Sequence, residues 1–166
     1  MAHLVFIVAS TGNNLVLANS VADSAQALGH TVDVLSLNGF NFPMYTAEEE
    51  SRTEVLDGLS DLSLRMNAGD AWMVFAPEYN GSYPPVLNNA IAWLSREGDD
   101  FRRLFRDRTV GLATHSGGGG THVIMAMRMQ FSFLGCNVIG RSLLTNRHKP
   151  ANPDIIDDLI NSMTNK

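Results

Sequence analysis

The amino-acid sequence predicts an α/β fold, in which helices cover both faces of a mostly parallel sheet. Short apolar runs alternate along the chain with segments of helical periodicity, and this alternation is typical of parallel sheets built with crossover helices. The apolar runs are nearly continuous, as expected of strands buried on both faces. Right-handed crossovers then leave only a few doubly wound topologies for such a sheet.

The first half of the chain contributes three predicted strands and two predicted helices. The strands are His3–Ala9, Thr31–Leu35 and Asp70–Ala76. Leu15–Leu28 is predicted to be a helix because its apolar residues recur at helical spacing and Gly29 can end it. A polar connection from Asn38 to Glu50 then leads to a second helix, Ser51–Asn67. The apolar residues expected on its buried face are Val55, Leu59, Leu62 and Met66.

The second half of the chain continues the alternation. Two further strands are predicted at Thr109–Thr114 and Cys136–Leu144. The helices are Pro85–Ser95, with proline tolerated in its first turn, Thr121–Leu134, and Asn152–Met163, with Asn152 as its cap. Five strands in this order favour the flavodoxin-like arrangement 2-1-3-4-5, so we expect residues 1–166 to form one flavodoxin-like domain.

The composition excludes several classes of protein. The formal net charge is −5 and there is no basic block, which argues against nucleic acid as a partner. No apolar run approaches the roughly 20 residues of a membrane span, and residues 1–8 resemble a strand, not a signal peptide. The single cysteine, Cys136, cannot form an internal disulfide and has apolar neighbours, so we expect it to be a core residue in a cytoplasmic protein.

The loop after the first strand, Ala9–Asn14, has the character of a phosphate site. It carries neutral hydrogen-bonding side chains and opens a helix, whose free amides and dipole favour an anion. The candidate binding residues are Ser10, Thr11, Asn13 and Asn14. The alternative is that these residues only cap the helix. The loop has no Lys or Arg and matches neither GxGxxG nor GxxxxGK[ST], which disfavours a triphosphate and suits a monophosphate.

The loop after the third strand is rigid and aromatic. We expect its backbone groups to form hydrogen bonds with the polar edge of a flat heterocycle, while Tyr79 or Tyr83 packs against the ring. The alternatives are a structural turn at Asn80-Gly81 and, for Glu78, a catalytic carboxylate, an ion pair or a subunit contact. The candidate binding residues here are Pro77, Glu78, Tyr79, Asn80, Gly81 and Ser82.

The loop after the fourth strand contains four consecutive glycines, Gly117–Gly120. Such a run costs chain entropy, and close approach of the backbone to a ligand would explain it. The alternative is a flexible surface loop. We expect His115, Ser116, Gly117 and Gly118 to contact the cofactor, and we give His115 a hydrogen-bonding role in preference to that of a general acid.

These three loops follow strands that are neighbours in the order 2-1-3-4-5, so they should converge on one crevice at the switch point of the sheet. Neutral phosphate donors on one side and amides beside aromatic rings on the other match the two ends of FMN. No catalytic side chain and no metal are expected, because the flavin carries the chemistry.

Two segments of the sequence resemble a known family. Pro77–Ser82, followed by Leu87, Asn89-Ala90-Ile91 and Trp93, resembles the signature of the NADPH-dependent FMN reductases, which include flavin-dependent quinone reductases, azoreductases and chromate-reducing enzymes. Ser116–Gly120, followed by a helix with Arg128, is similar to the second characteristic region of that family. The first loop departs from the family's usual Gly-Ser-x-Arg and is closer to the Thr-Gly-Asn loop of flavodoxins.

The resemblance implies an FMN-dependent oxidoreductase that takes electrons from NADPH or NADH and passes them to a quinone-like or other small acceptor. It also implies a homodimer or homotetramer. Met125, Met127 and Met129 alternate in their helix and so lie on more than one face, which agrees with burial at a subunit interface. The alternatives are an electron-transfer flavodoxin that shuttles electrons between proteins, and a degenerate domain that has lost its cofactor.

Overall fold

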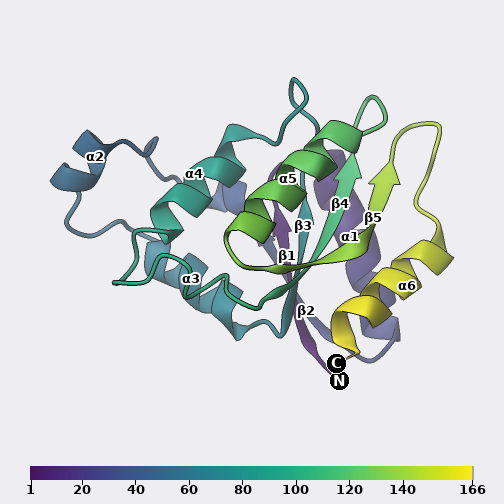
Figure 1. Ribbon diagram of the computed structural model, residues 1–166. Helices are drawn as coiled ribbons and strands as arrows, with labels where there is room; N and C mark the ends of the chain where they lie inside the picture. The colour runs from purple at the N-terminus through teal and green to yellow at the C-terminus, as the bar shows by residue number, and fades with distance from the viewer. Residues whose placement is uncertain (166) are drawn as a thin grey trace.

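The structure, a computed structural model, describes residues 1–165 and contains a five-stranded sheet (Figure 1). The strands are β1 (His3–Val8), β2 (Thr31–Ser36), β3 (Ala71–Phe75), β4 (Thr109–His115) and β5 (Asn137–Thr145). They lie in the order β2-β1-β3-β4-β5, and every neighbouring pair is parallel. The predicted fold class and strand order are therefore confirmed.

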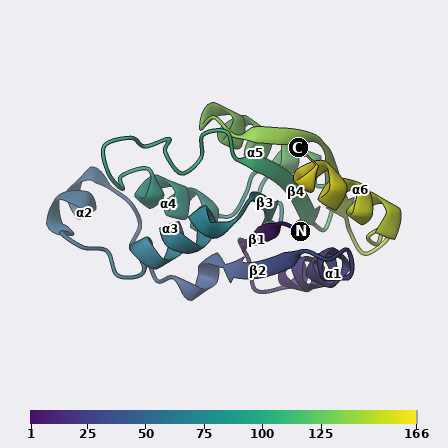
Figure 2. The ribbon, with the colours of Figure 1, turned by 90° about the horizontal axis from the view of Figure 1, so that it is seen from below.

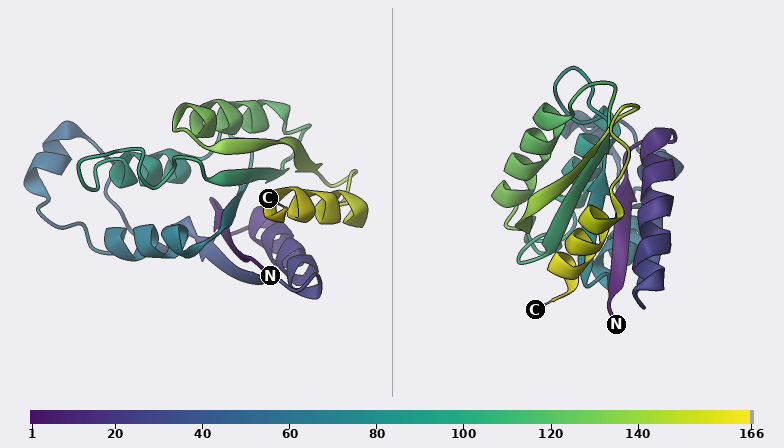
Figure 3. Two further views of the ribbon diagram at one scale, coloured as in Figure 1. Left: turned by 60° about the horizontal axis from the view of Figure 1, so that its bottom comes forward. Right: turned by 90° about the vertical axis from the view of Figure 1, so that its right-hand side faces the viewer.

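Helices cover the sheet on both faces (Figure 2). α1 (Asn13–Ala27) and α6 (Pro153–Thr164) pack on one face, and α3 (Leu59–Ala68), α4 (Pro85–Leu94) and α5 (Thr121–Phe133) pack on the other (Figure 3). Among residues 1–165, no helix has the length and apolar character that crossing a bilayer requires.

The two helical layers follow from the alternation of side chains along the central strands. In β1, Leu4 and Phe6 belong to the core shared with α1 and α6, whereas Val5 and Ile7 belong to the core shared with α3, α4 and α5. All four side chains are buried. A strand buried on both faces needs apolar residues at every position, which is why these runs are continuous in the sequence.

The prediction of one helix over Ser51–Asn67 is wrong. The structure has a short helix α2 (Ala47–Arg52) and a separate α3, joined by residues 53–58, and a 3-10 turn (η1) at Leu37–Gly39. α2 ends where Thr53 becomes extended, and Gly58, with φ +79 in the left-handed region, is the cap residue from which α3 begins. Val55, which we expected on the buried face, is 87% exposed. The helical spacing of apolar residues therefore runs across a connection that is not helical.

Helix ends elsewhere follow their sequence signals. Gly29 adopts φ +85 directly after the end of α1, and Pro85 is the first residue of α4. The Asn152 side chain accepts a hydrogen bond from the Asp154 amide at 2.8 Å, as expected of the cap of α6. Helix α1 begins at Asn13, two residues before the predicted Leu15, so the candidate phosphate loop after β1 leads directly into the helix.

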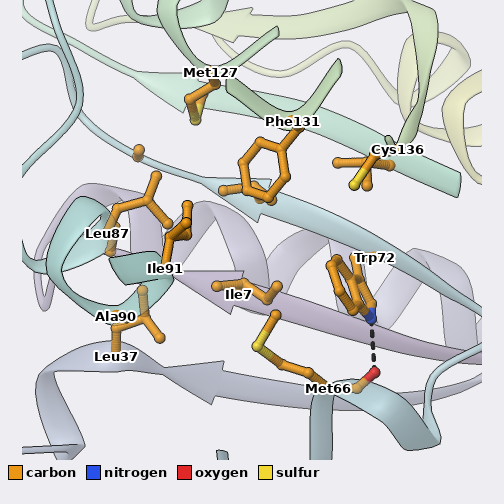
Figure 4. Close-up of a cluster of buried hydrophobic side chains, with 14 of the residues drawn as sticks. Ile7, Leu37, Met66, Trp72, Leu87, Ala90, Ile91, Met127, Phe131 and Cys136 are labelled. Carbon is orange, nitrogen blue, oxygen red and sulfur yellow. Dashed lines mark hydrogen bonds between the residues drawn. The ribbon is translucent and has the colours of Figure 1, made fainter. Parts of the chain in front are cut away.

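Trp72 of β3 is fully buried in the larger core (Figure 4). Its indole N–H donates to the Met66 carbonyl at 2.7 Å, which satisfies the polar atom of a fully buried side chain. The ring stands edge-on to Phe105, with centroids 5.9 Å apart. Trp72 therefore joins the sheet to the end of α3 by packing and by one directed hydrogen bond.

Cys136 belongs to the same core and is the residue before β5 (Figure 4). Its thiol donates to the Phe105 carbonyl at 3.2 Å. Burial raises the pKa of Cys136 to about 12, although the nearby Arg108 opposes part of that shift. Because the thiolate is the reactive form, this side chain is inert near neutral pH, in agreement with the expected core role.

We predict that Trp72→Phe lowers the free energy of unfolding by about 2–4 kcal/mol, because it opens a cavity in the larger core and removes the 2.7 Å hydrogen bond to the Met66 carbonyl, which keeps only the longer bond of 3.3 Å from the Gly69 amide. Trp93→Phe is the matched control. The Trp93 indole donates to the Pro43 carbonyl at 2.9 Å, but that carbonyl keeps a bond of 3.0 Å from Asn89, and Trp93 does not belong to the larger core. Urea unfolding should show a smaller loss for Trp93→Phe, and equal losses would contradict this account.

Candidate functional site

The loops that follow β1, β3 and β4 meet at one edge of the sheet, as expected from the strand order. The loops after β3, β4 and β5 emerge side by side at the top of the view in Figure 1. A cavity of about 370 Å³ and a second of about 330 Å³ lie among these loops. Both are lined by Asn13, Pro77, Tyr79 and His115, so they are parts of one hollow, which we call the loop crevice.

The first part of the loop crevice is lined mainly by the loop after β1. Its remaining lining residues are Ala9, Ser10, Thr11, Gly12, Asn14, Asn38, Pro84, Pro85 and Val86. The second part lies against the glycine-rich loop. Its remaining lining residues are Glu78, Ser116, Gly117 and Arg147.

Two sets of hydrogen bonds hold the loops together. The Asn14 carboxamide is buried, accepts from the His115 amide at 2.8 Å and donates to the His115 carbonyl at 2.9 Å. The Ser116 hydroxyl is also buried and accepts from the Glu78 amide at 3.0 Å. The first set joins the loops after β1 and β4, and the second joins the loops after β3 and β4. Asn14 and Ser116 thus use their side chains to fix the frame of the crevice.

The start of α1 presents free donors to the crevice. Gly12 is the cap residue, and no side chain caps this helix end. The interpretation that these polar residues merely cap the helix is therefore wrong. Among residues 1–165, the hydroxyls of Ser10 and Thr11 have no hydrogen-bond partner. The first backbone amides of a helix also have no acceptor within the helix. Such a helix start receives an anion through neutral donors.

The loop after β3 ends in a tight hairpin. Tyr79 and Ser82 exchange two backbone hydrogen bonds of 2.8 and 3.0 Å, and both central residues, Asn80 and Gly81, have positive φ. This is a type I′ turn, as the Asn-Gly pair predicts. The amides of Tyr79, Ser82 and Glu78 are used internally. Within the described chain the amides of Asn80 and Gly81 remain free, so they are the donors that this hairpin can offer a ligand.

The Glu78 carboxylate has a structural partner. It accepts from the Val123 amide at 3.1 Å, in the first turn of α5, and its other oxygen lies 3.7 Å from the His122 ring. The cap residue of α5 is Gly120, which has no side chain to satisfy that turn. Glu78 therefore satisfies a helix start from a neighbouring loop. Of the roles left open for it by sequence, this geometry favours an ion-pair and capping role over catalysis.

The glycines of the third loop fall into two kinds. Gly120 has φ +69, and a Cβ there would lie 2.5 Å from the Thr114 side chain, so the fold itself requires glycine. Gly117 and Gly118 have no positive φ, and a Cβ at either would meet no described atom within 4 Å. Nothing in residues 1–165 explains why these two positions lack side chains. Both glycines are exposed, so the surface loop that the sequence offered as the alternative stays open beside the close approach of a ligand to the backbone.

His115 is held by its ring as well as by its backbone. Thr145 donates its hydroxyl proton to the Thr114 carbonyl at 2.9 Å, and its oxygen lies 3.1 Å from Nδ1 of His115. The imidazole must then carry its proton on Nδ1, which leaves Nε2 of the neutral ring as an acceptor. This arrangement agrees with the hydrogen-bonding role that the sequence suggested.

The structure adds residues that sequence reasoning missed. Asn38 lines the crevice because β2 lies beside β1, and the predicted strand order would have been enough to place it there. Arg147 reaches the crevice from the turn after β5. Because β5 lies next to β4, the predicted strand order would also have placed this turn beside the glycine-rich loop. Tyr83, in contrast, packs against the core and is not among the residues that line the crevice, and burial raises its pKa.

The arrangement suits a ligand with a flat polar ring and an anionic tail. Free amides and hydroxyls gather at the start of α1, the hairpin after β3 leaves the Asn80 and Gly81 amides free, and two exposed glycines leave the backbone of the third loop open. FMN has both features, so the residues present fit it.

Comparisons with known proteins agree with this fit. The family model described as NADPH-dependent FMN reductase matches residues 2–149. The quinone reductase of Escherichia coli K12 is 27% identical over 124 residues, which cover 70% of this chain. The chain spans 64% of the length of that relative.

Solved structures share the fold. FerB, a flavoenzyme NAD(P)H:(acceptor) oxidoreductase from Paracoccus denitrificans, superposes with a TM-score of 0.79 at 16% identity, over 98% of this chain and 95% of the other. An oxidoreductase from Corynebacterium diphtheriae superposes with a TM-score of 0.74 at 17% identity, over 98% and 94% of the two chains.

The family match covers most of the chain and includes all three loops of the crevice. The chain therefore belongs to the NADPH-dependent FMN reductase family, whose members are oxidoreductases that use FMN with NAD(P)H as the electron donor.

Proposed function

We propose that residues 1–166 form one FMN-binding domain that transfers electrons from NAD(P)H to a quinone-like or other small acceptor. The observation that carries this proposal is the loop crevice itself. Free donors lie at the start of α1, which lines the crevice, and at Asn80 and Gly81, which follow the lining residue Tyr79 in the hairpin after β3. On its other side the crevice is bordered by the exposed glycine-rich loop, in which no described contact excludes a side chain at Gly117.

The start of α1 would hold the phosphate of FMN. The hydroxyls of Ser10 and Thr11, the Asn13 side chain and the first helix amides supply neutral donors there. Asn14 would act differently from the sequence-based expectation, because both ends of its carboxamide bond to His115. Its contribution is to position the loop, and any contact with the phosphate would come from its backbone.

The loops after β3 and β4 would hold the flavin ring. The amides of Asn80 and Gly81 would meet its polar edge, with Pro77 and Tyr79 shaping that wall and Ser82 fixing the turn through its backbone bonds to Tyr79. Gly117 and Gly118 would allow the ring to approach the opposite backbone. Preorganised amides of this kind stabilise negative charge that develops on a ring when it is reduced.

The protein's part in the reaction is to bind and to orient. Bound FMN would supply the redox chemistry by accepting a hydride from NAD(P)H and passing two electrons to the acceptor. Among residues 1–165, Cys136 is the only cysteine and is buried, so no thiol nucleophile faces the crevice. If the oxidised dinucleotide leaves before the acceptor enters the same place, the kinetics will be ping-pong.

Helix α5 exposes an apolar face that suits a second copy of the chain. Met125, Met129 and Phe133 are spaced four residues apart and are 65%, 72% and 68% exposed, whereas Met127 is fully buried. We propose a homodimer or homotetramer that covers this face, in a cytoplasmic protein whose one cysteine remains a free thiol. A monomer in sedimentation velocity would contradict the oligomer.

An electron-transfer flavodoxin is the second candidate, because the Thr11-Gly12-Asn13 loop with neutral donors resembles that of flavodoxins. A flavodoxin would bind FMN but would not turn over a small acceptor with NAD(P)H. Small-molecule turnover therefore separates the two candidates.

We predict that the purified protein binds FMN and, once loaded, oxidises NADPH or NADH when a quinone is present. The absorbance of the dinucleotide reports the rate, and varying both substrates should give the parallel double-reciprocal lines of ping-pong kinetics. FMN binding without turnover would favour the flavodoxin. Absence of FMN binding at micromolar concentrations would contradict both candidates.

Thr11→Ala tests the phosphate site. It should weaken FMN binding by about 1–3 kcal/mol, because one neutral donor to a phosphate is lost, and leave stability almost unchanged, because Thr11 caps nothing. Thr46→Ala is the matched control, since Thr46 accepts from the Glu49 amide at 3.0 Å and caps α2. The control should lose about 0.5–2 kcal/mol of stability and keep its FMN affinity. Unchanged FMN affinity in Thr11→Ala would remove Thr11 from the site.

Gly118→Val tests the approach of the flavin to the third loop. The protein has room for the new side chain, so the variant should fold and yet lose FMN binding. Gly140→Val is the control, because Gly140 in β5 also has free space but lies away from the crevice, whereas Gly118 adjoins Gly117, which lines it. Fluorescence titration with FMN measures both variants. Normal affinity in Gly118→Val would show that no ligand approaches there.

A further inference from the structure

Three consecutive basic residues, Arg147, His148 and Lys149, form a tight turn after β5. Asn146 and Lys149 exchange backbone hydrogen bonds of 2.9 and 3.1 Å. The Asn146 side chain also accepts from the His148 and Lys149 amides, at 2.8 and 2.9 Å. The turn is therefore fixed by its own hydrogen bonds, and its basic side chains project from a defined backbone.

The basic turn is fastened to the glycine-rich loop of the crevice. The Asn146 side chain donates to the Gly118 carbonyl at 3.1 Å, and the Ser116 amide donates to the Thr145 carbonyl at 3.2 Å. These bonds bring Arg147 to the crevice, where it lines the second part together with Asn13 and Gly117. Asn13 is the first residue of α1, so the guanidinium and the start of α1 border the same cavity.

Arg147 brings positive charge to a crevice whose other donors are neutral. Among the described residues that line the crevice, it is the only lysine or arginine. No carboxylate of residues 1–165 pairs with it. Other arginines of the chain do pair with a carboxylate, namely Arg52, Arg65, Arg96, Arg106 and Arg141.

The one side-chain partner of Arg147 leaves most of its donors free. Its Nε donates to Nε2 of His148 at 2.7 Å, so His148 must be unprotonated at that nitrogen. The terminal N–H groups of the guanidinium remain available in this part of the chain. In a chain of net charge −5, an arginine with free N–H groups at a crevice points to an anion that comes from outside the chain.

We propose that Arg147 is a phosphate-recognition residue that supplies the charge absent from the α1 loop. This inference rests on the proposed function. A planar guanidinium binds phosphate oxygens in a bidentate manner, and a phosphate monoester is the anion that nucleotides bring to such a site. Two sources offer that group, the 5′-phosphate of FMN and the 2′-phosphate of NADPH. The cavity shared with Asn13 makes the first accessible, and the exposed position of the turn makes the second accessible.

The test compares ligands that differ only by a phosphate. Arg147→Ala should raise the Kd of FMN about tenfold and leave the Kd of riboflavin within about twofold, if the residue binds the 5′-phosphate. If it binds the 2′-phosphate, FMN affinity stays constant. Calorimetry on the FMN-loaded protein should then show weaker binding of adenosine 2′,5′-bisphosphate and unchanged binding of 5′-AMP. The KM for NADPH should rise, and the KM for NADH should stay the same. Arg147→Lys should retain part of the effect in either case.

Arg141→Ala is the control of equal charge change, since Arg141 pairs with Asp158 and does not line the crevice. It should behave as wild type in every arm. The proposal is overturned if Arg147→Ala leaves the affinity for every phosphate-bearing ligand unchanged, or if it weakens the binding of FMN and of riboflavin equally. Failure of the wild-type protein to bind any flavin would instead overturn the proposed function, so the two failures are distinguishable.

Discussion

The site depends on the hydrogen bonds between the Asn14 carboxamide and the backbone of His115. These bonds fix the first turn of α1 against the end of β4, although the two residues are far apart in the sequence. The sheet order makes this possible, because parallel strands bring their carboxyl ends to one edge. A buried amide that lost its partner would carry a desolvation cost of about 1–3 kcal/mol, which favours one arrangement of the loops.

The polar atoms around the crevice divide into two groups, and this division explains how a neutral site can be specific. One group faces inward and joins the loops, as the Ser116 hydroxyl and the Glu78 carboxylate do. The other group has no partner in residues 1–165, as with the Asn80 and Gly81 amides and the first amides of α1. A fixed frame with outward donors is preorganised, so little ordering is needed when a ligand binds.

Much of this arrangement followed from the sequence, because strand burial and turn chemistry are local signals. The strand order and the Asn-Gly turn were predicted correctly. The helix predicted over Ser51–Asn67 failed because the spacing of apolar residues does not register the extended Thr53 and the left-handed Gly58, which separate α2 from α3. Sequence could not assign partners to Glu78 or Asn14, since their contacts join loops that only the tertiary structure brings together. Arg147 could have been found, because the predicted order already places the loop after β5 beside the loop after β4.

The central claim is that one nucleotide lies across the loops after β1, β3 and β4. A crystal structure of the FMN complex tests it most directly. The account predicts the phosphate at the first amides of α1 and the polar edge of the ring at the Asn80-Gly81 amides, between the hairpin and the backbone of Gly117 and Gly118. FMN bound elsewhere on the molecule, or a complex in which the crevice stays empty, would contradict it.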